Sequence, residues 1–165
     1  MTEEDIIQEL TKGQRKAPER FGIGDDAALI VDNRIITHDT MIESIHWDNK
    51  LSPADVGWKL VAINVSDIGA MGGIPEWCTL SLSVPEKTPF DWIQQFSKGM
   101  RKALLKWNVT LIGGDTTRSP NSIVASMAMG SRRGYNWAWQ HTAEIGDDIW
   151  VTGTLGDAAS GFFEP

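Results

Sequence analysis

Several stretches of this chain place carboxylates beside glycine or at the expected end of a strand or helix. They are Asp25-Asp26, Asp39, Asp67 and Asp115. Mg²⁺ prefers oxygen ligands and commonly bridges carboxylates to substrate phosphates, whereas three histidines and one cysteine do not favour zinc. Gly113-Gly114 can turn successive N–H groups toward an anion. An isolated acidic residue beside glycine is most often a turn former, so these residues predict a Mg²⁺–phosphate site only if they meet in the fold.

Composition narrows the class of protein. The formal net charge of −7 over 165 residues argues against a broad nucleic-acid or anionic-membrane surface. Divalent cations captured by carboxylates would still allow a phosphorylated ligand to bind. No apolar run approaches the roughly 20 residues that span a bilayer, and the lone Cys78 excludes an intrachain disulfide. We therefore expect a cytoplasmic protein with no nucleic-acid or membrane partner.

The elements that must position these carboxylates follow from local patterns. Thr2 and Asp5 form the pattern of a capping box for a short first helix. Ser52-Pro53 and Thr88-Pro89 open two long helices, the first of which ends at Gly72-Gly73. β-like runs predict strands at Ala27–Val31, Arg34–Thr40 (after a two-residue turn), Cys78–Val84, Val109–Ile112, Ile123–Met129 and Ile149–Val151. This order predicts an α+β fold, a mixed sheet of hairpin-connected strands covered by two long helices.

Four longer strings contain most of these carboxylates and are more specific than single residues. They are GIGDDAALI at 22–30, NVSDIGAMGGIPEW at 64–77, LIGGDTTRSP at 111–120 and DDIWVTGTLGDAASG at 147–161. In this order and spacing they resemble the thiamine-monophosphate kinases, in the superfamily of aminoimidazole ribonucleotide synthetase. The resemblance runs from about Phe21 to the last residue. It implies the N-terminal-domain fold of that superfamily, followed by the start of a second α+β domain.

The resemblance also implies roles for individual residues. ATP would meet Gly114 and Asp115, and His46 matches a histidine that contacts substrate. Thiamine phosphate, the implied acceptor, is already anionic, so metals and positioning must do the work and no nucleophile or catalytic base is assigned. Several Mg²⁺ ions would be held by Asp26, Thr37, His38, Asp39, Asp67 and Asp115.

The string IGDD occurs twice, and the resemblance separates the two copies. Asp26 of the first copy is the implied metal ligand, with Asp25 as a supporting or turn residue. Asp147-Asp148 of the second copy matches a variable turn that leads into the second domain, so we expect it to be structural. Two positions depart from the family pattern. His38 replaces a small hydroxyl residue, and Gln140 replaces an arginine that contacts ATP.

The expected domain organisation is an N-terminal helix and loop at 1–20, a metal- and ATP-binding domain at 21–140, and the beginning of a second domain at 141–165. Family members are longer and carry an Asp-x-Ser-Asp-Gly motif in the second domain, so this chain corresponds to an N-terminal portion. The resemblance implies ATP-dependent phosphorylation of thiamine phosphate to thiamine diphosphate by a homodimer. Two alternatives stay open: a non-catalytic homologue that dimerises or binds Mg²⁺–nucleotide, and another ATP-dependent enzyme of the superfamily.

Overall fold

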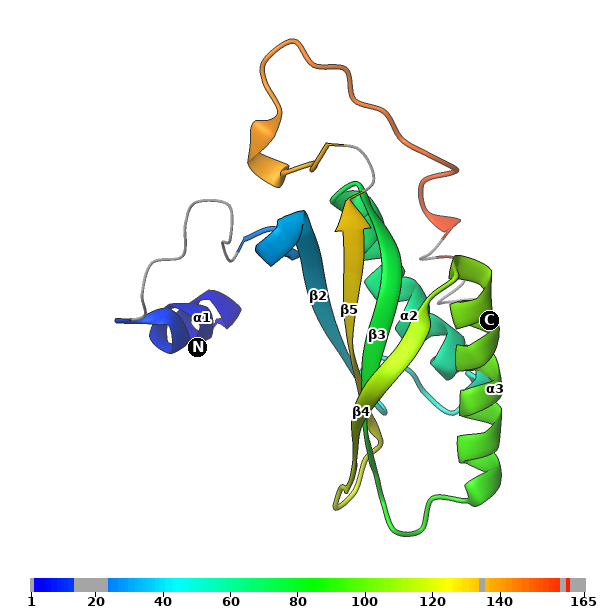
Figure 1. Cartoon of the computed structure of the whole chain (residues 1–165). Coiled ribbons are helices and arrows are strands. Elements are labelled where there is room, and N and C mark those ends of the chain that lie inside the picture. The colour runs from blue at the N-terminus through cyan, green and yellow to red at the C-terminus, as the bar shows by residue number, and fades with distance from the viewer. Residues whose placement is uncertain (1, 14–23, 134–135, 158–159, 161–165) are drawn as a thin grey trace.

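A computed structural model of the chain describes residues 2–13, 24–133, 136–157 and 160 (Figure 1). Most of the predicted loop at 12–20 and the last residues of the predicted second domain therefore lie outside the described residues. No helix within the described ranges is long and apolar enough to cross a membrane. The elements follow in the order α1 (Glu3–Thr11), β1 (Ala28–Ile30), the 3-10 turn η1 (Val31–Asn33), β2 (Arg34–Ile42), α2 (Pro53–Ala70), β3 (Gly73–Val84), α3 (Phe90–Trp107), β4 (Thr110–Arg118), β5 (Val124–Arg133) and η2 (Gln140–Thr142).

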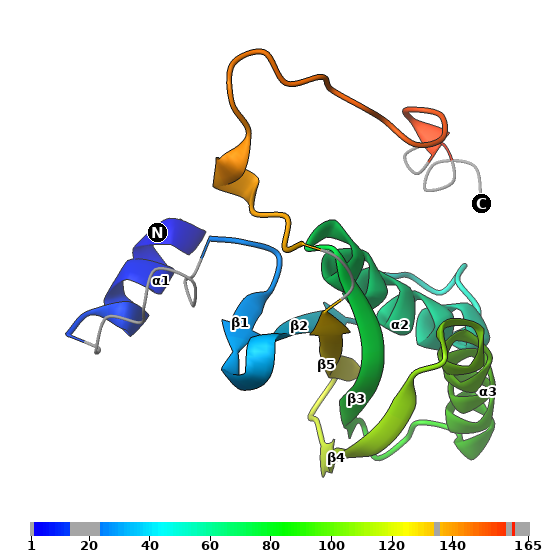
Figure 2. The same cartoon turned by 45° about the horizontal axis from the view of Figure 1, so that its top comes forward.

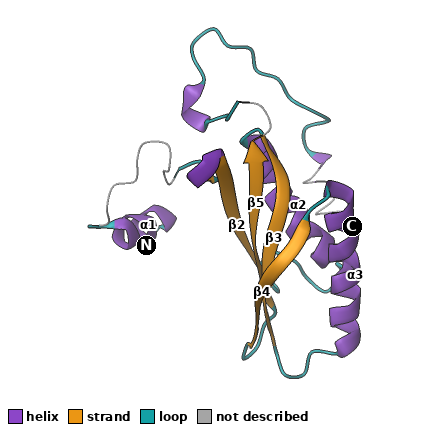
Figure 3. Cartoon of the chain, in the orientation of Figure 1, coloured by secondary structure: helices purple, strands orange, loops and turns teal. Residues whose placement is uncertain are grey.

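The strands form one mixed sheet in the order β1-β2-β5-β3-β4. β3 and β4 pair in parallel through the crossover helix α3, and the other neighbours are antiparallel. Both long helices lie on one side of the sheet (Figures 1 and 3), and the turned view keeps them there (Figure 2). The predicted α+β class, with two long helices over a mixed sheet, is confirmed.

Side chains alternate along each strand, so the sheet has one side that faces the helices and one open side. In β2, Ile35, Thr37 and Met41 are buried, whereas His38 and Thr40 are exposed. β5 continues the same face, because its register pairs Thr37 with Met129 and Asp39 with Met127. The core between sheet and helices is made of Ile35, Met41, Val56, Leu60, Ile68, Cys78, Phe96, Ala125, Met127 and Met129, among others.

Helix α2 starts and stops where the sequence indicated. The backbone N–H of Asp55 donates to Oγ of Ser52 at 3.2 Å, and Pro53 occupies the first helical position. Gly72, with φ of +74°, ends the helix in a conformation that favours glycine. Two other glycines let α2 and α3 touch through their backbones. A Cβ on Gly99 would stand 1.7 Å from the carbonyl oxygen of Ala54, and one on Gly57 would stand 2.2 Å from that of Phe96.

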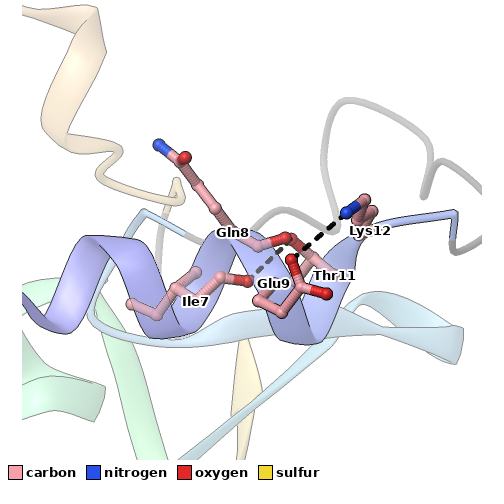
Figure 4. A network of polar contacts seen from close by, with 5 residues as sticks. All are labelled: Ile7, Gln8, Glu9, Thr11 and Lys12. Carbon is pink, nitrogen blue, oxygen red and sulfur yellow. Dashed lines mark hydrogen bonds and ion pairs between the residues drawn. The ribbon is translucent and has the colours of Figure 1, made fainter. Parts of the chain in front are cut away.

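Helix α1 is capped as predicted but packs little. Thr2 and Asp5 form the capping box, and no residue of the helix is buried. Near its end, Oγ1 of Thr11 donates to the carbonyl oxygen of Ile7 at 2.8 Å, and Lys12 pairs with Glu9 at 3.4 Å (Figure 4). In both overall views α1 stands apart from the sheet (Figures 1 and 2).

The strand predictions were wrong in three places, and the predicted bounds of β2, β3 and β5 were also too short. The turn after β1 has three residues rather than two, since Ile30 pairs with Arg34. β4 continues through Gly113-Gly114 to Arg118 instead of ending there, because a register shift opposite Cys78 and Thr79 absorbs the extra residue. Ile149–Val151 form no strand and are exposed, since no described strand pairs with them.

Candidate metal and phosphate site

Three of the predicted ligands meet where β2 lies against α2. The Thr37 hydroxyl is 2.8 Å from Oδ2 of Asp67 and 3.0 Å from the backbone carbonyl oxygen of Asp26. A hydroxyl has one proton, so it donates to one of these oxygens at a time. Thr37 is buried on the helix-facing side of β2, and Asp67 lies one turn before the end of α2. The β2 alternation and the α2 helical period therefore bring residues 30 positions apart into contact.

Asp39 joins this cluster from the same face of β2. It is partly buried, and burial raises the pKa of its carboxyl. The negative charge of Asp67 raises this pKa further, while the nearby His38 and His46 oppose the rise. Asp39 and Asp67 thus form a pair of carboxylates whose repulsion a bound cation would relieve. We name Asp26, Thr37, Asp39 and Asp67 the carboxylate cluster.

The oxygen atoms of the carboxylate cluster match the ligands that Mg²⁺ prefers. Every polar group in the carboxylate cluster offers oxygen, and one or two carboxylates with substrate phosphates suffice for this ion. One turn before Asp67, the buried Oδ1 of Asn64 has no hydrogen-bond partner among the described residues. Among those same residues, no three His, Cys, Asp or Glu side chains are grouped closely enough to hold a metal by themselves. The cluster fits a Mg²⁺ that is completed by phosphate and water.

The two histidines with predicted roles, His38 and His46, lie in different places relative to β2. His38 is exposed on the open face of β2, opposite to Thr37 and Asp39. His46 lies just beyond the strand, where its Nδ1 accepts a hydrogen bond from the backbone N–H of Ile42 at 3.0 Å. In the neutral ring the proton must then be on Nε2. His46 therefore presents an N–H donor on the ring edge that faces away from Ile42.

Gly114 and Asp115 lie away from the carboxylate cluster. β4 is three strand positions from β2, about 14 Å at the usual strand spacing. Across the sheet, Asp115 of β4 pairs with Ser81 of β3, and Ser81 pairs with Ser126 of β5. Ser126 in turn pairs with Thr40 of β2, which is exposed on the open face. Asp115 therefore belongs to the open face, whereas Asp39 belongs to the helix-facing side. Within one copy of the chain the structure does not bring these two carboxylates together.

The two IGDD copies make different contacts. Asp25 and Asp26 of the first copy both accept hydrogen bonds from Gln140, a residue more than a hundred positions away. In the second copy, Oδ2 of Asp147 accepts from the backbone N–H of Glu144 at 2.8 Å and closes an exposed turn. This confirms that the second copy forms a turn. The Gln140 contacts were missed because no local pattern in the sequence indicates them.

The comparison with protein families decides what kind of domain carries this cluster. Residues 24–132 match the family described as AIR synthase related protein, N-terminal domain. The chain belongs to this family. The match includes every residue of the carboxylate cluster, together with His38, His46, Gly114 and Asp115.

Individual members of the AIR synthase related family extend the comparison. The thiamine-monophosphate kinase of Buchnera aphidicola subsp. Acyrthosiphon pisum is 45% identical over 168 residues, which cover 98% of this chain and 51% of that protein. The crystal structure of thiamine-monophosphate kinase from Stenotrophomonas maltophilia K279a is 41% identical with a TM-score of 0.71, covering 96% of this chain and 50% of that one. A structure described as AaThiL complexed with AMPPCP and TMP is 29% identical with a TM-score of 0.85 and the same coverage. The chain spans about half the length of the curated relatives it matches.

Proposed function

We propose that this chain provides the metal- and ATP-binding half of an enzyme that phosphorylates thiamine phosphate to thiamine diphosphate. Similar proteins are named thiamine-monophosphate kinases, and a similar structure holds AMPPCP and TMP. The observation that carries the proposal is the meeting of Asp39 and Asp67 with Thr37 and the backbone of Asp26. Such a group of oxygens suits a hard cation that also binds phosphate.

In this proposal Asp26, Thr37, Asp39 and Asp67 hold Mg²⁺, with any contribution of His38 coming from its main chain. Bound Mg²⁺ would supply positive charge to the phosphates as they approach and as the transferring group develops charge. The Thr37 hydroxyl keeps Asp67 turned toward β2. The negative pair is costly without a cation, so the site is prepared for a positive charge before substrate arrives.

The reaction requires no base from this chain. A phosphate oxygen of thiamine phosphate forms a bond to the γ-phosphorus of ATP, the bond from that phosphorus to the β,γ-bridging oxygen breaks, and ADP leaves with the electron pair. The acceptor oxygen is anionic at neutral pH and has no proton to lose. The chain's residues therefore act by orientation. The Nε2–H of His46 is a suitable donor to the acceptor phosphate, since its Nδ1 is already occupied by Ile42.

We further propose a cytoplasmic homodimer that forms through the open face of the sheet. Both long helices cover the other side (Figure 3). Hydrogen bonds on the open face join Thr40 to Ser126 and Ser83 to Thr117. Asp115 lies on this face, so such a dimer would cover it. Gly114 and Asp115 would contact ATP there, and the domain division at about 140 would separate this part from the second domain.

A chimera tests the proposed activity. Residues 1–157 of this chain would be joined to the remaining half of the Stenotrophomonas relative, and thiamine diphosphate formed from ATP and thiamine phosphate would be measured by chromatography. We expect a Mg²⁺-dependent product, lost in Asp39→Asn and Asp67→Asn chimeras that keep their circular dichroism. A folded chimera that binds ATP but phosphorylates no thiamine phosphate would favour one of the two alternative readings, a different acceptor or a non-catalytic domain. An Asp39→Asn chimera that forms thiamine diphosphate at the full rate would show that Asp39 does not bind the metal.

A further inference from the structure

The segment of residues 136–142, which we name the strap, is tied to the end of the sheet at several points. The backbone N–H of Ala138 donates to the carbonyl oxygen of Met71 at 3.1 Å, just after α2. The indole Nε1 of Trp137 donates to Oδ1 of Asn33 at 2.8 Å. The strap also packs closely on Gly72, where a Cβ would stand 2.7 Å from the carbonyl oxygen of Asn136. These contacts place the next residues of the strap over the first IGDD copy.

Gln140 contacts both aspartates of that copy. Its backbone N–H donates to Oδ1 of Asp25 at 2.8 Å, and its side-chain Nε2 donates to Oδ1 of Asp26 at 3.2 Å. The other oxygen of Asp25 lies 4.0 Å from Nδ1 of His141. The carboxylate of Asp25 is therefore used for anchoring the strap, whereas Oδ2 of Asp26 receives nothing from Gln140.

Asp26 is thus held through both its main chain and its side chain. Its backbone carbonyl oxygen lies 3.0 Å from the Thr37 hydroxyl, inside the carboxylate cluster, and its carboxylate is held by the Gln140 amide. An amide donor orients a carboxylate without neutralising it, since the group carries no charge. A lysine at the same position would also hold Asp26, but with no nucleotide present it would pair with that carboxylate and cancel the charge that a cation needs, whereas the arginine of the family pattern is expected to contact ATP. The neutral residue at position 140 thus matters for the charge of the site as well as for its geometry.

We propose that Gln140 is a positioning residue, which fixes the carboxylate of Asp26 so that its second oxygen faces a divalent cation. The inference rests on the proposed function, because that proposal makes Asp26 a ligand. Residues that orient metal ligands from outside typically change metal affinity about 10–100-fold when they are replaced. Gln140 is exposed, so replacing it does not disturb the core.

The test measures Mn²⁺ binding to the chain by electron paramagnetic resonance, with no nucleotide present. We expect Gln140→Ala to weaken Mn²⁺ binding about 10-fold and Gln140→Lys to weaken it at least as much, although the Gln140→Lys variant should keep the urea midpoint of the unmodified chain. Gln94→Ala, on the exposed side of α3, is the matched control and should bind like the unmodified chain. Because Gln140→Lys should lose Mn²⁺ binding while it keeps the urea midpoint, that loss would not come from weaker bracing of the strap.

Two outcomes would overturn the proposal in distinguishable ways, and a third would refute the effect of charge at position 140. If the unmodified chain binds Mn²⁺ and Asp26→Asn weakens it, but Gln140→Ala binds normally, Gln140 only braces the strap and the metal site stands. If neither Asp26→Asn nor Asp39→Asn changes Mn²⁺ binding, or the unmodified chain binds none, the proposed metal site itself fails and the role of Gln140 falls with it. If Gln140→Lys binds Mn²⁺ as tightly as the unmodified chain, the charge at position 140 does not affect the metal site.

Discussion

The hydroxyl of Thr37 and the carboxylate of Asp67 meet across the boundary between β2 and α2, with 2.8 Å between Oγ1 and Oδ2. Thr37 is buried in the sheet, and Asp67 is in the last turns of the helix. This contact joins β2, which carries Asp39, to α2, which carries Asp67. The position of the two carboxylates therefore depends on one buried hydroxyl as well as on the packing of α2.

Replacing Thr37 by valine keeps its shape and removes the hydroxyl. We expect a loss of about 1–3 kcal/mol in the free energy of unfolding, because a partly buried carboxylate then loses a donor. Thr37→Ser keeps the hydroxyl and serves as the control. Urea denaturation measures both, and equal stability of the two variants would show that the hydrogen bond contributes nothing.

Asp39→Asn should have opposite effects with and without metal. In EDTA we expect the variant to melt at a higher temperature than the unmodified chain, because burial and Asp67 disfavour the charge of Asp39, as its raised pKa indicates. With Mg²⁺ present, the unmodified chain should gain stability by binding and the variant should gain little. Thermal unfolding in both buffers tests this, and an equal Mg²⁺ effect on both proteins would exclude Asp39 as a ligand.

Burial of Cys78 should make the stability of the chain sensitive to alkaline pH. Burial raises the pKa of its thiol to about 11, whereas an unfolded thiol has a pKa of about 8.5. The folded state therefore favours the protonated thiol. This contribution is fully present below about pH 8.5 and is lost as the pH rises through about 11. The urea midpoint of Cys78→Ala, followed over the same range, should lack this loss; parallel curves for the two proteins would count against it.

Gly99→Ala should destabilise the contact between α2 and α3. A new Cβ would collide with the backbone of Ala54, and we expect a loss of about 1–3 kcal/mol or more from overpacking. Gly69→Ala is the matched control, since nothing lies within 4 Å of its added Cβ. That variant should be neutral or more stable by up to about 1 kcal/mol from helix propensity. Similar denaturation midpoints for the two alanine variants would refute the close helix contact.

Features with local causes could be predicted from the sequence. Helix α2 starts at Ser52-Pro53 because the Ser52 side chain caps the backbone N–H of Asp55, three residues later. Strand β3 is visible in the sequence because apolar and polar residues alternate along Cys78–Val84. The convergence of Asp26, Asp39, Asp67 and Asp115 was expected from their positions at glycine-rich element ends and from the family resemblance. The structure brings the first three together with Thr37 but leaves Asp115 on the open face.

Features with distant causes could not be predicted. Gly113-Gly114 looks like a strand end, but pairing with β3 carries the strand through it. Ile149–Val151 has strand-forming residues, yet a strand needs a neighbour and none of the described residues provides one. The contact of Gln140 with Asp26 joins positions 114 residues apart. No pattern in the sequence around either residue predicts this contact.

The position at which Mn²⁺ binds is the most direct test of a metal site between β2 and α2. Substoichiometric Mn²⁺ with AMPPCP, added to the isotope-labelled chain, broadens the nuclear magnetic resonance signals nearest the ion. We predict that the amides of Asp26, Asp39 and Asp67 broaden first, while those of Asp147 and Asp148 stay sharp although they carry the same IGDD string. Broadening that begins at Asp147-Asp148, or that spreads evenly over the acidic surface, would contradict a metal site between β2 and α2.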